Sequence, residues 1–281
     1  MRLLLEDKVA IISGGASGLG RATAELMAEE GASVVIADIN VERGEETAKA
    51  IEAAGGQAAF LRTDVRKAAD VQAVVQLAED TFGKLTTMVA NAGIVGSASG
   101  KRLEDLDEDE WMEIHNVNLF GVWRCFKYAA PAIRRAGGGS MSATSSLGGI
   151  ETLGGSALGA YSSSKAGVVA IASFLATELI TDRIRVNTVC PGGMATNIAE
   201  SVPGLSPEML AQMKEIMYQP KPFGTTGYPT AQPVEVARVH LFLNSDLAGF
   251  VTGQTILADG GGFINMPRVV FNPDSLPRDG V

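Results

Sequence analysis

The sequence contains few aromatic residues, only two cysteines, and no cluster of lysine or arginine. Its formal net charge is −9. An acidic chain without a basic patch lacks the electrostatic feature by which proteins bind nucleic acid, so that class of function is excluded. Cys125 and Cys190 have no metal-ligand spacing and make no disulfide framework. We therefore expect buried free thiols and no metal site.

Long apolar runs, internal repeats and low-complexity tracts are also missing from the sequence. The opening stretch "MRLLLEDKVAIISGG" is short and is interrupted by Glu6, Asp7 and Lys8. Neither a signal peptide nor a membrane span is expected from it. The sequence thus predicts a cytoplasmic protein with no membrane partner.

Short β-rich runs alternate with longer amphipathic segments over most of the chain. Alternation at these lengths predicts an α/β fold with a doubly wound parallel sheet, flanked by helices on both faces in the Rossmann manner. The predicted strands lie at residues 8–13, 33–38, 58–65, 86–93, 140–146 and 183–190, and the predicted helices at 18–30, 41–55, 68–83, 107–135 and from 161 onward.

The regular alternation breaks after Pro191. Residues 197–232, rich in proline and glycine around one short amphipathic helix, are predicted to form a substrate lid. A further helix and strand close a single domain over residues 1–262. The tail at 263–281 has three prolines and no periodicity, so we expect it on the surface or at a subunit contact.

The segment "SGGASGLG" joins the first predicted strand to the first predicted helix. Gly14, Gly18 and Gly20 permit a tight turn and a close approach of the backbone to a ligand. Free N–H groups at the start of the helix would bind a pyrophosphate. A glycine-rich turn without a ligand is the competing interpretation.

Asp38 ends the second predicted strand, 18 residues after Gly20. An acid at this point can hydrogen-bond the ribose hydroxyls of a dinucleotide, although aspartate also occurs there as a helix N-cap. It would repel a ribose 2′-phosphate, and no basic residue stands at 15–17, 39 or 40 to bind one. The sequence therefore favours NAD over NADP.

Tyr161 and Lys165 are four residues apart in "GAYSSSKAGVVA", where a helix is predicted to begin. Residues at this spacing lie on one face of a helix, with Cβ atoms about 5–6 Å apart. The solvated opening of an ordinary helix would also explain the pair when it is taken alone.

Together these motifs resemble the short-chain dehydrogenase/reductase family, in its small single-domain type, from about Glu6 to Gly262. The glycine segment resembles the family's T-G-x3-G-x-G with serine in place of threonine, and "YSSSK" matches its Y-x3-K. Similar elements in the family's order are "TDV" at 63–65, "NAG" at 91–93, "NVN" at 116–118, "SS" at 145–146, "PGGMAT" at 191–196, "VTGQ" at 251–254 and "DGG" at 259–261.

The resemblance implies an NAD-dependent enzyme that interconverts a secondary alcohol and a ketone. Its catalytic residues would be Asn118, Ser146, Tyr161 and Lys165. The cofactor-binding residues that it implies, with those argued above, are Gly14, Ser17, Gly18, Leu19, Gly20, Asp38, Ile39, Asp64, Val65, Asn91, Ala92, Gly93, Tyr161, Lys165, Pro191, Gly192, Met194 and Thr196.

Several positions depart from the family pattern. Ala90 replaces the usual asparagine before "NAG", and the loop at 147–160 is longer than usual and is predicted to bulge over the substrate. The strand at 140–146 is short of the usual β-branched apolar residues. Ser145 stays open as an alternative to Ser146 for the catalytic serine.

Tyrosine ordinarily titrates near pH ~10 and is a poor base at neutrality. A lysine cation one turn away favours the phenolate, as does the positive nicotinamide of NAD, so we expect the two charges together to lower the pKa of Tyr161. Tyr161 would then exchange a proton with the substrate oxygen, which Ser146 would orient. Lys165 would also hydrogen-bond the nicotinamide ribose. Asn118 would hold a water molecule that links Lys165 to solvent.

Methionines at 209, 213 and 217 follow a helical spacing in the predicted lid. Such a stripe more often indicates packing, but together with Met194 and residues 147–158 it would form an apolar cleft. A fairly hydrophobic or cyclic alcohol or ketone is then favoured over a sugar.

Two other functions compete with this one. A catalytically silent NAD-binding sensor or scaffold is opposed by the intact catalytic set. A reductase of 3-oxoacyl thioesters usually goes with NADPH and a basic patch, and neither is indicated. The resemblance also implies a homo-tetramer assembled through the helices at 107–135 and 161–181, with Trp111, Trp123 and Phe126 facing the interface.

Overall fold

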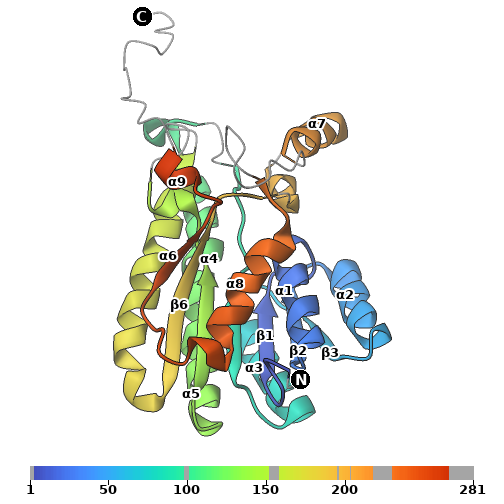
Figure 1. The fold of residues 1–281 in the computed structure, drawn as a ribbon. Helices are drawn as coiled ribbons and strands as arrows, with labels where there is room; N and C mark the ends of the chain where they lie inside the picture. Colours follow the sequence, from blue (N-terminus) through green and yellow to red (C-terminus); the bar gives the residue numbers. More distant parts are fainter. Residues whose placement is uncertain are drawn as a thin grey trace, which may run out of the picture.

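A computed structural model describes residues 3–97, 101–151, 158–194, 196–202, 204–217 and 230–265. In these ranges, seven parallel strands form one sheet in the order β3-β2-β1-β4-β5-β6-β9. The predicted doubly wound parallel sheet is confirmed (Figure 1). The strands are β1 (Val9–Ser13), β2 (Ser33–Asp38), β3 (Gln57–Arg62), β4 (Thr87–Ala90), β5 (Gly139–Thr144), β6 (Ile184–Pro191) and β9 (Thr255–Ala258).

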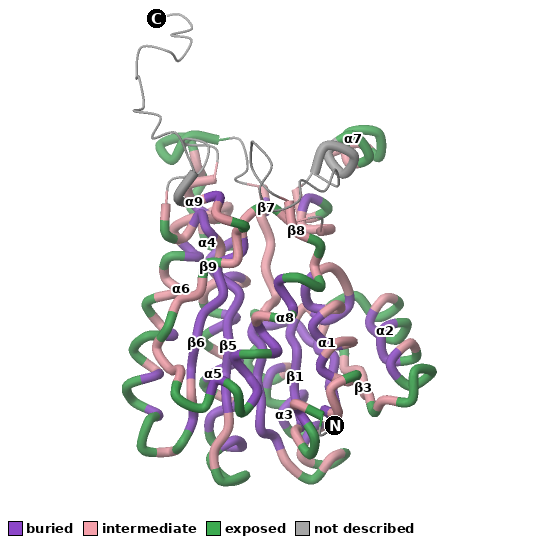
Figure 2. Tube along the Cα trace, in the orientation of Figure 1, coloured by how far each residue is buried: buried purple, intermediate pink, exposed green. Residues whose placement is uncertain are grey.

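Helices cover both faces of the sheet because alternate residues of each strand point to opposite sides. Val9 and Ile11 belong to the apolar core beneath α3, α5 and α6, whereas Ala10 and Ile12 belong to the core beneath α1 and α2. The buried strands form the centre of Figure 2. The helices are α1 (Gly18–Glu29), α2 (Val41–Ala53), α3 (Ala68–Phe82), α4 (Glu108–Asn118), α5 (Phe120–Arg135), α6 (Gly159–Glu178), α7 (Pro207–Met217), α8 (Pro233–Asn244) and α9 (Gly262–Asn265).

The single long helix predicted over 107–135 is wrong, because the chain breaks it at Leu119. This residue has φ −105° and ψ −60°, and it ends α4 and precedes α5. The break lets the two helices pack on different neighbours: α4 lies against α6, and α5 lies against α3 and the sheet. Asn118 thereby becomes the last residue of a helix instead of an interior one.

The predicted lid contains a short 3-10 helix, η5 (Asn197–Ser201), and α7. β7 (Gly193–Met194) and β8 (Thr230–Ala231) form a small parallel pair at its two ends. Residues 203, 218–229 and 266–281, which include part of the lid and nearly all of the tail, lie outside the described residues. Among the residues that are described, no helix is both long enough and apolar enough to cross a membrane.

Candidate active site

The predicted functional residues gather at the carboxyl edge of the sheet. The strand order reverses direction between β1 and β4, and in such sheets ligands bind outside the carboxyl ends of the strands at this reversal. The glycine loop follows β1, Asn91 follows β4, and Ser145 and Ser146 follow β5. The sequence therefore places one candidate site here.

The glycine loop has the backbone that its residues predict. Gly14 and Gly18 have φ of +68° and +52°, values that other residues rarely adopt. A Cβ atom on Gly14 would lie 2.8 Å from Ala92 Cα, and one on Gly20 would overlap the carbonyl oxygen of Gly14. Ser17 does not cap α1, and the first turn of α1 has no acidic residue. This helix N-terminus fits the pyrophosphate of a dinucleotide.

Asp38 lies at the end of β2 and is tied to the glycine loop. Its Oδ2 accepts a hydrogen bond from Ala16 N at 3.0 Å, and its Oδ1 accepts one from Asn40 N at 2.9 Å. Asn40, whose side chain accepts from Arg43 N, is the N-cap of α2. Asp38 is therefore not the helix cap that the sequence also allowed.

Asp64 follows β3 and is occupied by a neighbouring residue. Its carboxylate pairs with Arg66, Nη2 lying 2.8 Å from Oδ2, and only 5% of Asp64 is exposed. The hydrogen bond from Arg66 lowers the pKa of Asp64. The side chain of Asp64 is thus fixed by the protein, which leaves the cofactor contact predicted for it to its backbone and to the buried Val65.

Asn91 links the glycine loop to the centre of the sheet. Its backbone N–H donates to Ser13 Oγ at 3.0 Å, and its side-chain amide donates to Gly14 O at 3.3 Å. Thr144 Oγ1 in turn donates to Asn91 Oδ1 at 2.9 Å. Gly93 lies beside Lys165, since a Cβ atom there would be 3.1 Å from Lys165 Nζ.

Tyr161, Lys165 and Ser146 meet as the sequence predicts. The Tyr161 hydroxyl lies close enough to the Ser146 side chain for Ser146 to lower the pKa of Tyr161. Lys165 Nζ lies 5.7 Å from the centre of the Tyr161 ring and donates to Thr144 O at 2.9 Å. Both residues come from the first two turns of α6, which explains their common face.

Burial is the largest influence on the pKa values of Tyr161 and Lys165 in the protein without a bound cofactor. Desolvation raises the pKa of Tyr161, against the opposing effect of its hydrogen bond with Ser146. Desolvation also lowers the pKa of Lys165 to about 8. Lys165 does not lower the pKa of Tyr161 in the chain alone, so the predicted lowering depends on the second predicted charge, that of the nicotinamide.

The two serines after β5 have different partners. Ser145 is buried and donates to the main-chain carbonyl of Lys165 at 2.7 Å. Ser146 Oγ accepts from Gly148 N at 3.1 Å and faces Tyr161. The geometry thus favours Ser146 over Ser145 as the serine that reaches a substrate.

Asn118 is fully buried at the end of α4 and clamps the residue that follows Gly93. Its Oδ1 accepts from Ile94 N and its Nδ2 donates to Ile94 O, both at 2.8 Å. Nδ2 also donates to Ser164 Oγ at 3.1 Å. Ser164 therefore connects Asn118 to α6.

The segment after β6 folds back over the glycine loop. Gly192 N donates to Ala258 O at 3.1 Å, and a Cβ atom on Gly18 would lie 3.3 Å from Thr196 Cβ. Pro191 is buried and Met194 packs on the core beside α1 and α8. Met194 is thus partly committed to packing.

Arg43 near the cofactor loop escaped the sequence analysis. Its Nη1 lies 2.8 Å from Glu200 Oε2, which joins α2 to η5 across the chain. The pair borders a pocket of about 500 Å³ at the start of α1. In the sequence, Arg43 is visible only as a basic residue five positions after Asp38, in the first turn of the helix that follows β2. The pocket is lined by Ser17, Gly18, Arg21, Arg43, Asn197 and Val234, among others.

The predicted substrate side is only partly described. Met209 is 50% exposed, so it does not line an enclosed cleft. The side chains of Met213 and Met217, and residues 152–157 and 195, lie outside the described residues. Cys125 and Cys190 are buried free thiols, as predicted, and burial raises both pKa values. Within the described ranges, no group of three or more histidine, cysteine or acidic side chains could hold a metal ion.

Comparison with known proteins gives relatives over nearly the whole chain. Residues 14–262 match the family model described as enoyl-(acyl carrier protein) reductase. The chain is 38% identical over 257 residues to a 2,5-dichloro-2,5-cyclohexadiene-1,4-diol dehydrogenase of Sphingobium indicum, covering 92% of this chain and 96% of that protein. It is 37% identical over 255 residues to a cyclohexanol dehydrogenase of Acinetobacter sp., covering 90% and 94%.

The fold has close structural relatives as well. A crystal structure of a short-chain type dehydrogenase/reductase from Mycobacterium marinum superimposes with a TM-score of 0.82 and 30% identity, over 93% of this chain and 97% of that one. Sequence, fold and the order of the motifs agree. The chain belongs to the short-chain dehydrogenase/reductase family.

Proposed function

We propose that this protein is an NAD-dependent dehydrogenase that interconverts a secondary alcohol and a ketone, on an apolar and cyclic substrate. The observation that carries the proposal is Tyr161, whose hydroxyl interacts with Ser146 and whose ring lies beside the buried Lys165, at the edge of the sheet that holds the glycine loop. A proton-transfer group thus lies next to a nucleotide-binding loop.

The residues of the chain divide the chemistry among themselves. Tyr161 takes the proton from the alcohol, or returns it to the ketone, because its hydroxyl lies beside Ser146, which would hold the substrate oxygen. Ser146 donates a hydrogen bond to the substrate oxygen and stabilises the charge that develops there. NAD, when bound, supplies the hydride acceptor and a positive charge. The positive charge lowers the pKa of Tyr161, whereas burial raises it.

Lys165 and Asn118 hold this arrangement in place. Because burial lowers its pKa to about 8, Lys165 gives up its proton more readily than an exposed lysine does, which suits it to relay the proton from Tyr161. Its ammonium is aimed by Thr144 O. Asn118 fixes Ile94, and through it the backbone beside Gly93 and Lys165.

The preference for NAD rests on the charges around Asp38. Its carboxylate is held at the glycine loop by Ala16 N, and a negative charge there disfavours a ribose 2′-phosphate. Arg43 is the nearby cation, but its guanidinium is paired with Glu200. The net arrangement supports NAD over NADP.

The proposed substrate class comes from the relatives and from the polarity of the site. Both curated relatives compared above are dehydrogenases of cyclic alcohols by name. The family model is described as an acyl carrier protein reductase, so reduction of an acyl thioester is the second candidate. The net charge of −9 disfavours an acidic carrier protein, which places this candidate behind the first.

We also propose that the protein assembles as a homo-tetramer in the cytoplasm, where free thiols such as Cys125 persist. On the predicted interface helices, Trp123 is 41% and Phe174 is 74% exposed. Phe126 is buried in the core of the chain, so the prediction that it faces another subunit is wrong.

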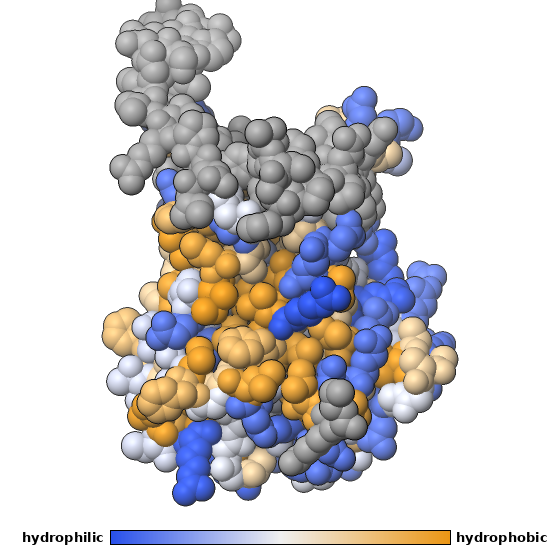
Figure 3. All heavy atoms as spheres, in the orientation of Figure 1, coloured by the Kyte–Doolittle hydropathy of each residue, from blue (hydrophilic) through white to orange (hydrophobic). Residues whose placement is uncertain are grey.

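A second apolar face lies around α8 and β9 and is visible in Figure 3. Phe242, Leu247, Phe250 and Leu257 are exposed there by 37% to 106%. Two such faces would bring four copies together, since exposed apolar patches commonly mark protein contacts.

A screen of secondary alcohols with NAD, followed by NADH absorbance, tests the proposed activity. Cyclohexanols and cyclic diols should be oxidised, whereas linear polyols and 3-hydroxyacyl thioesters should react slowly. Turnover of the thioesters alone would favour the second candidate. NAD binding without turnover of any alcohol or ketone would instead support the silent sensor.

A further inference from the structure

The strand β5 carries polar side chains where a buried strand is expected to be apolar. Ser142 and Thr144 are two residues apart, so both point to the same face of the sheet. His240 of α8 lies completely buried between them. Its Nδ1 is 2.9 Å from Ser142 Oγ and its Nε2 is 3.1 Å from Thr144 Oγ1. The missing apolar residues of β5 are thus explained by a histidine on another element.

The hydrogen bonds around His240 can run in only one direction. Gly14 O can only accept, so Asn91 directs its amide nitrogen there and its oxygen toward Thr144. The Thr144 hydroxyl donates to that oxygen, and it must therefore accept from His240 Nε2–H. His240 Nδ1 is then an acceptor, and the hydroxyl of Ser142 donates to it.

The far end of this chain of hydrogen bonds agrees with that direction. Ser142 Oγ accepts from Asn244 Nδ2 at 2.8 Å, which leaves its hydrogen for His240. A protonated imidazole would have two N–H donors, so Nδ1 could no longer accept the hydrogen bond from the Ser142 hydroxyl. Burial lowers the pKa of His240 to about 4, so the neutral ring persists at physiological pH.

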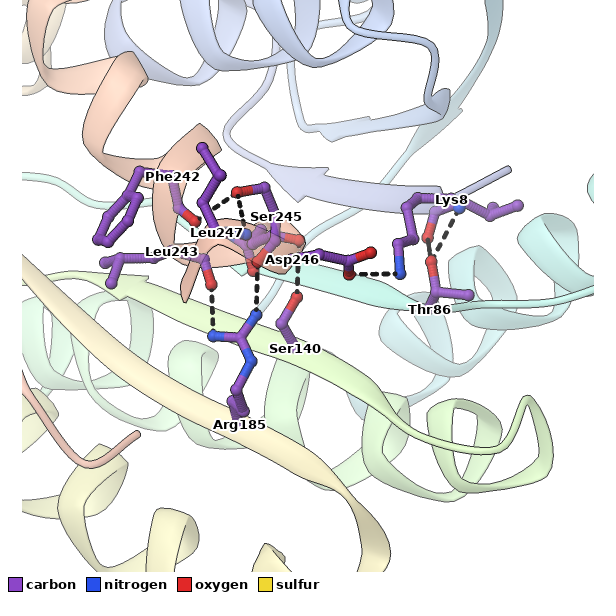
Figure 4. A network of polar contacts seen from close by, with 11 residues as sticks. Lys8, Thr86, Ser140, Arg185, Phe242, Leu243, Ser245, Asp246 and Leu247 are labelled. Atoms are coloured by element: carbon purple, nitrogen blue, oxygen red, sulfur yellow. Dashed lines mark hydrogen bonds and ion pairs between the residues drawn. The ribbon is translucent and has the colours of Figure 1, made fainter. Parts of the chain in front are cut away.

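The helix that bears His240 is anchored at its C-terminus (Figure 4). Arg185 of β6 donates to Leu243 O at 2.7 Å and to Ser245 O at 3.1 Å. Lys8 pairs with Asp246 at 3.2 Å. α8 therefore holds a fixed position above β5, and the imidazole is presented to Thr144 from a rigid element.

The other end of the network reaches both halves of the candidate active site. Asn91 Nδ2 holds the carbonyl of Gly14, the first glycine of the cofactor loop, at 3.3 Å. The carbonyl of Thr144 accepts from Lys165 Nζ at 2.9 Å. Thr144 thus connects His240 to the cofactor loop through its hydroxyl and Asn91, and to Lys165 through its main-chain carbonyl.

We propose that His240 is a positioning residue for the nicotinamide cofactor, acting from the opposite face of the sheet. Through Thr144 and Asn91 it sets the orientation of the Gly14 carbonyl, and so the shape of the loop that receives the pyrophosphate. The inference rests on the proposed function, because it assumes that NAD binds at this loop. The affinity for NAD, more than the rate of the chemical step, should depend on His240.

Two substitutions separate the two ends of the imidazole. His240→Gln keeps a donor near the Nε2 position and so keeps the bond to Thr144, whereas His240→Asn keeps an acceptor near Nδ1 and so keeps the bond to Ser142. The dissociation constant for NAD, measured by isothermal titration calorimetry, should rise roughly five- to tenfold in His240→Asn and by less than about twofold in His240→Gln. The melting temperature of each variant is measured alongside.

A merely structural role predicts a different pattern, in which NAD affinity follows the melting temperature and His240→Gln has no advantage. That result would overturn the proposal. If the wild type itself binds neither NAD nor NADP, the proposed function fails and this inference fails with it.

Thr144→Val and Thr144→Ser provide a second pair that does not alter α8. Valine keeps the shape of threonine and removes the hydroxyl, so affinity for NAD should fall by about fivefold, while serine keeps the hydroxyl and should retain it. Equal affinities in the two variants would contradict the role assigned to the network, even if both His240 variants failed to fold.

Discussion

The Ser145 hydroxyl binds the main-chain carbonyl of Lys165 at 2.7 Å, whereas its neighbour in sequence faces the side chain of Tyr161. Ser145 thus holds the backbone of α6, and Ser146 points toward the reacting groups. Two adjacent hydroxyls at the end of one strand are divided between structure and chemistry because successive residues of an extended chain point in opposite directions.

Replacement of each serine by alanine should separate these roles. Ser146→Ala should lower kcat by about 10²–10³-fold and leave the dissociation constant for NAD nearly unchanged, as for a donor to a developing oxyanion. Ser145→Ala should destabilise the protein by about 1–3 kcal/mol, because the Lys165 carbonyl loses a buried partner. Steady-state kinetics and urea unfolding check both. A larger loss of kcat in Ser145→Ala than in Ser146→Ala would reverse the assignment.

Tyr161→Phe should abolish turnover, because it removes the hydroxyl that is proposed to exchange a proton with the substrate. The phenyl ring keeps the packing of α6, so NAD should bind with nearly unchanged affinity. Calorimetric titration with NAD provides the control for folding. Normal activity in this variant would be incompatible with the proposed mechanism.

Lys165 is a charged group that the fold disfavours, so its removal should stabilise the protein. Burial lowers its pKa from 10.5 to about 8. Below pH 8 the folded protein keeps Lys165 as a buried ammonium, which lowers the free energy of unfolding by about 3 kcal/mol. The hydrogen bond from Lys165 to Thr144 O offsets part of this loss. Lys165→Met should therefore raise the free energy of unfolding at pH 7 by about 1–3 kcal/mol while abolishing turnover.

The sign of the pH dependence follows from the same pKa. Between pH 8 and 10.5 the unfolded chain binds more protons at Lys165 than the folded chain does, so this residue makes stability rise with pH in that window. The difference in free energy of unfolding between wild type and Lys165→Met should shrink as the pH is raised from 7 to 10. A difference that grows with pH would show that the ammonium is stabilised in the fold.

Much of the site was predictable because its signals are local. The glycine loop, Asp38 and the Tyr161–Lys165 pair each depend on a few neighbouring residues, and one strand or helix positions each of them. The His240 network was not predictable, since Ser142 and His240 are 98 residues apart and each was read alone. Serines in β5 then indicated only a weak strand.

Other misses have the same origin in distance along the chain. Arg43 and Glu200 are 157 residues apart, and neither residue signals the other. The break at Leu119 precedes Gly121 by two residues, but a single glycine does not by itself predict a break, and α4 and α5 separate because they pack on different partners. The choice between Ser145 and Ser146 required the position of α6, which local sequence does not contain.

The cofactor preference offers a test in which two charges are changed independently. Asp38→Asn removes the charge that repels a 2′-phosphate, and the ratio of the dissociation constants for NADP and NAD should fall by about tenfold. Glu200→Gln leaves Arg43 without its ion pair, so a guanidinium becomes free to attract the phosphate. The double variant should bind NADP more tightly than either single one.

The exposed positions of Arg43 and Glu200 mean that loss of their ion pair should have little effect on stability. Arg43 and Glu200 have side-chain exposures of 41% and 29%, so loss of their pair should change the free energy of unfolding by less than about 1 kcal/mol. NADP that already binds the wild type more tightly than NAD would refute the argument from Asp38. An unchanged ratio in Glu200→Gln would place Arg43 outside the ribose site.

The apolar face around α8 and β9 permits a test of assembly that leaves the catalytic residues untouched. Phe250 is fully exposed in the isolated chain, so burying it against a second copy would stabilise the tetramer by apolar transfer. Phe250→Glu should place a charge in that contact and leave a dimer held by the face of α5 and α6 that carries Trp123 and Phe174. Phe174→Glu should instead leave a dimer held by the face around α8 and β9. Analytical ultracentrifugation distinguishes these species, with Met209→Glu, an exposed residue of α7, as the control. A wild type that sediments as a monomer would remove the basis for both faces, because neither would then be covered.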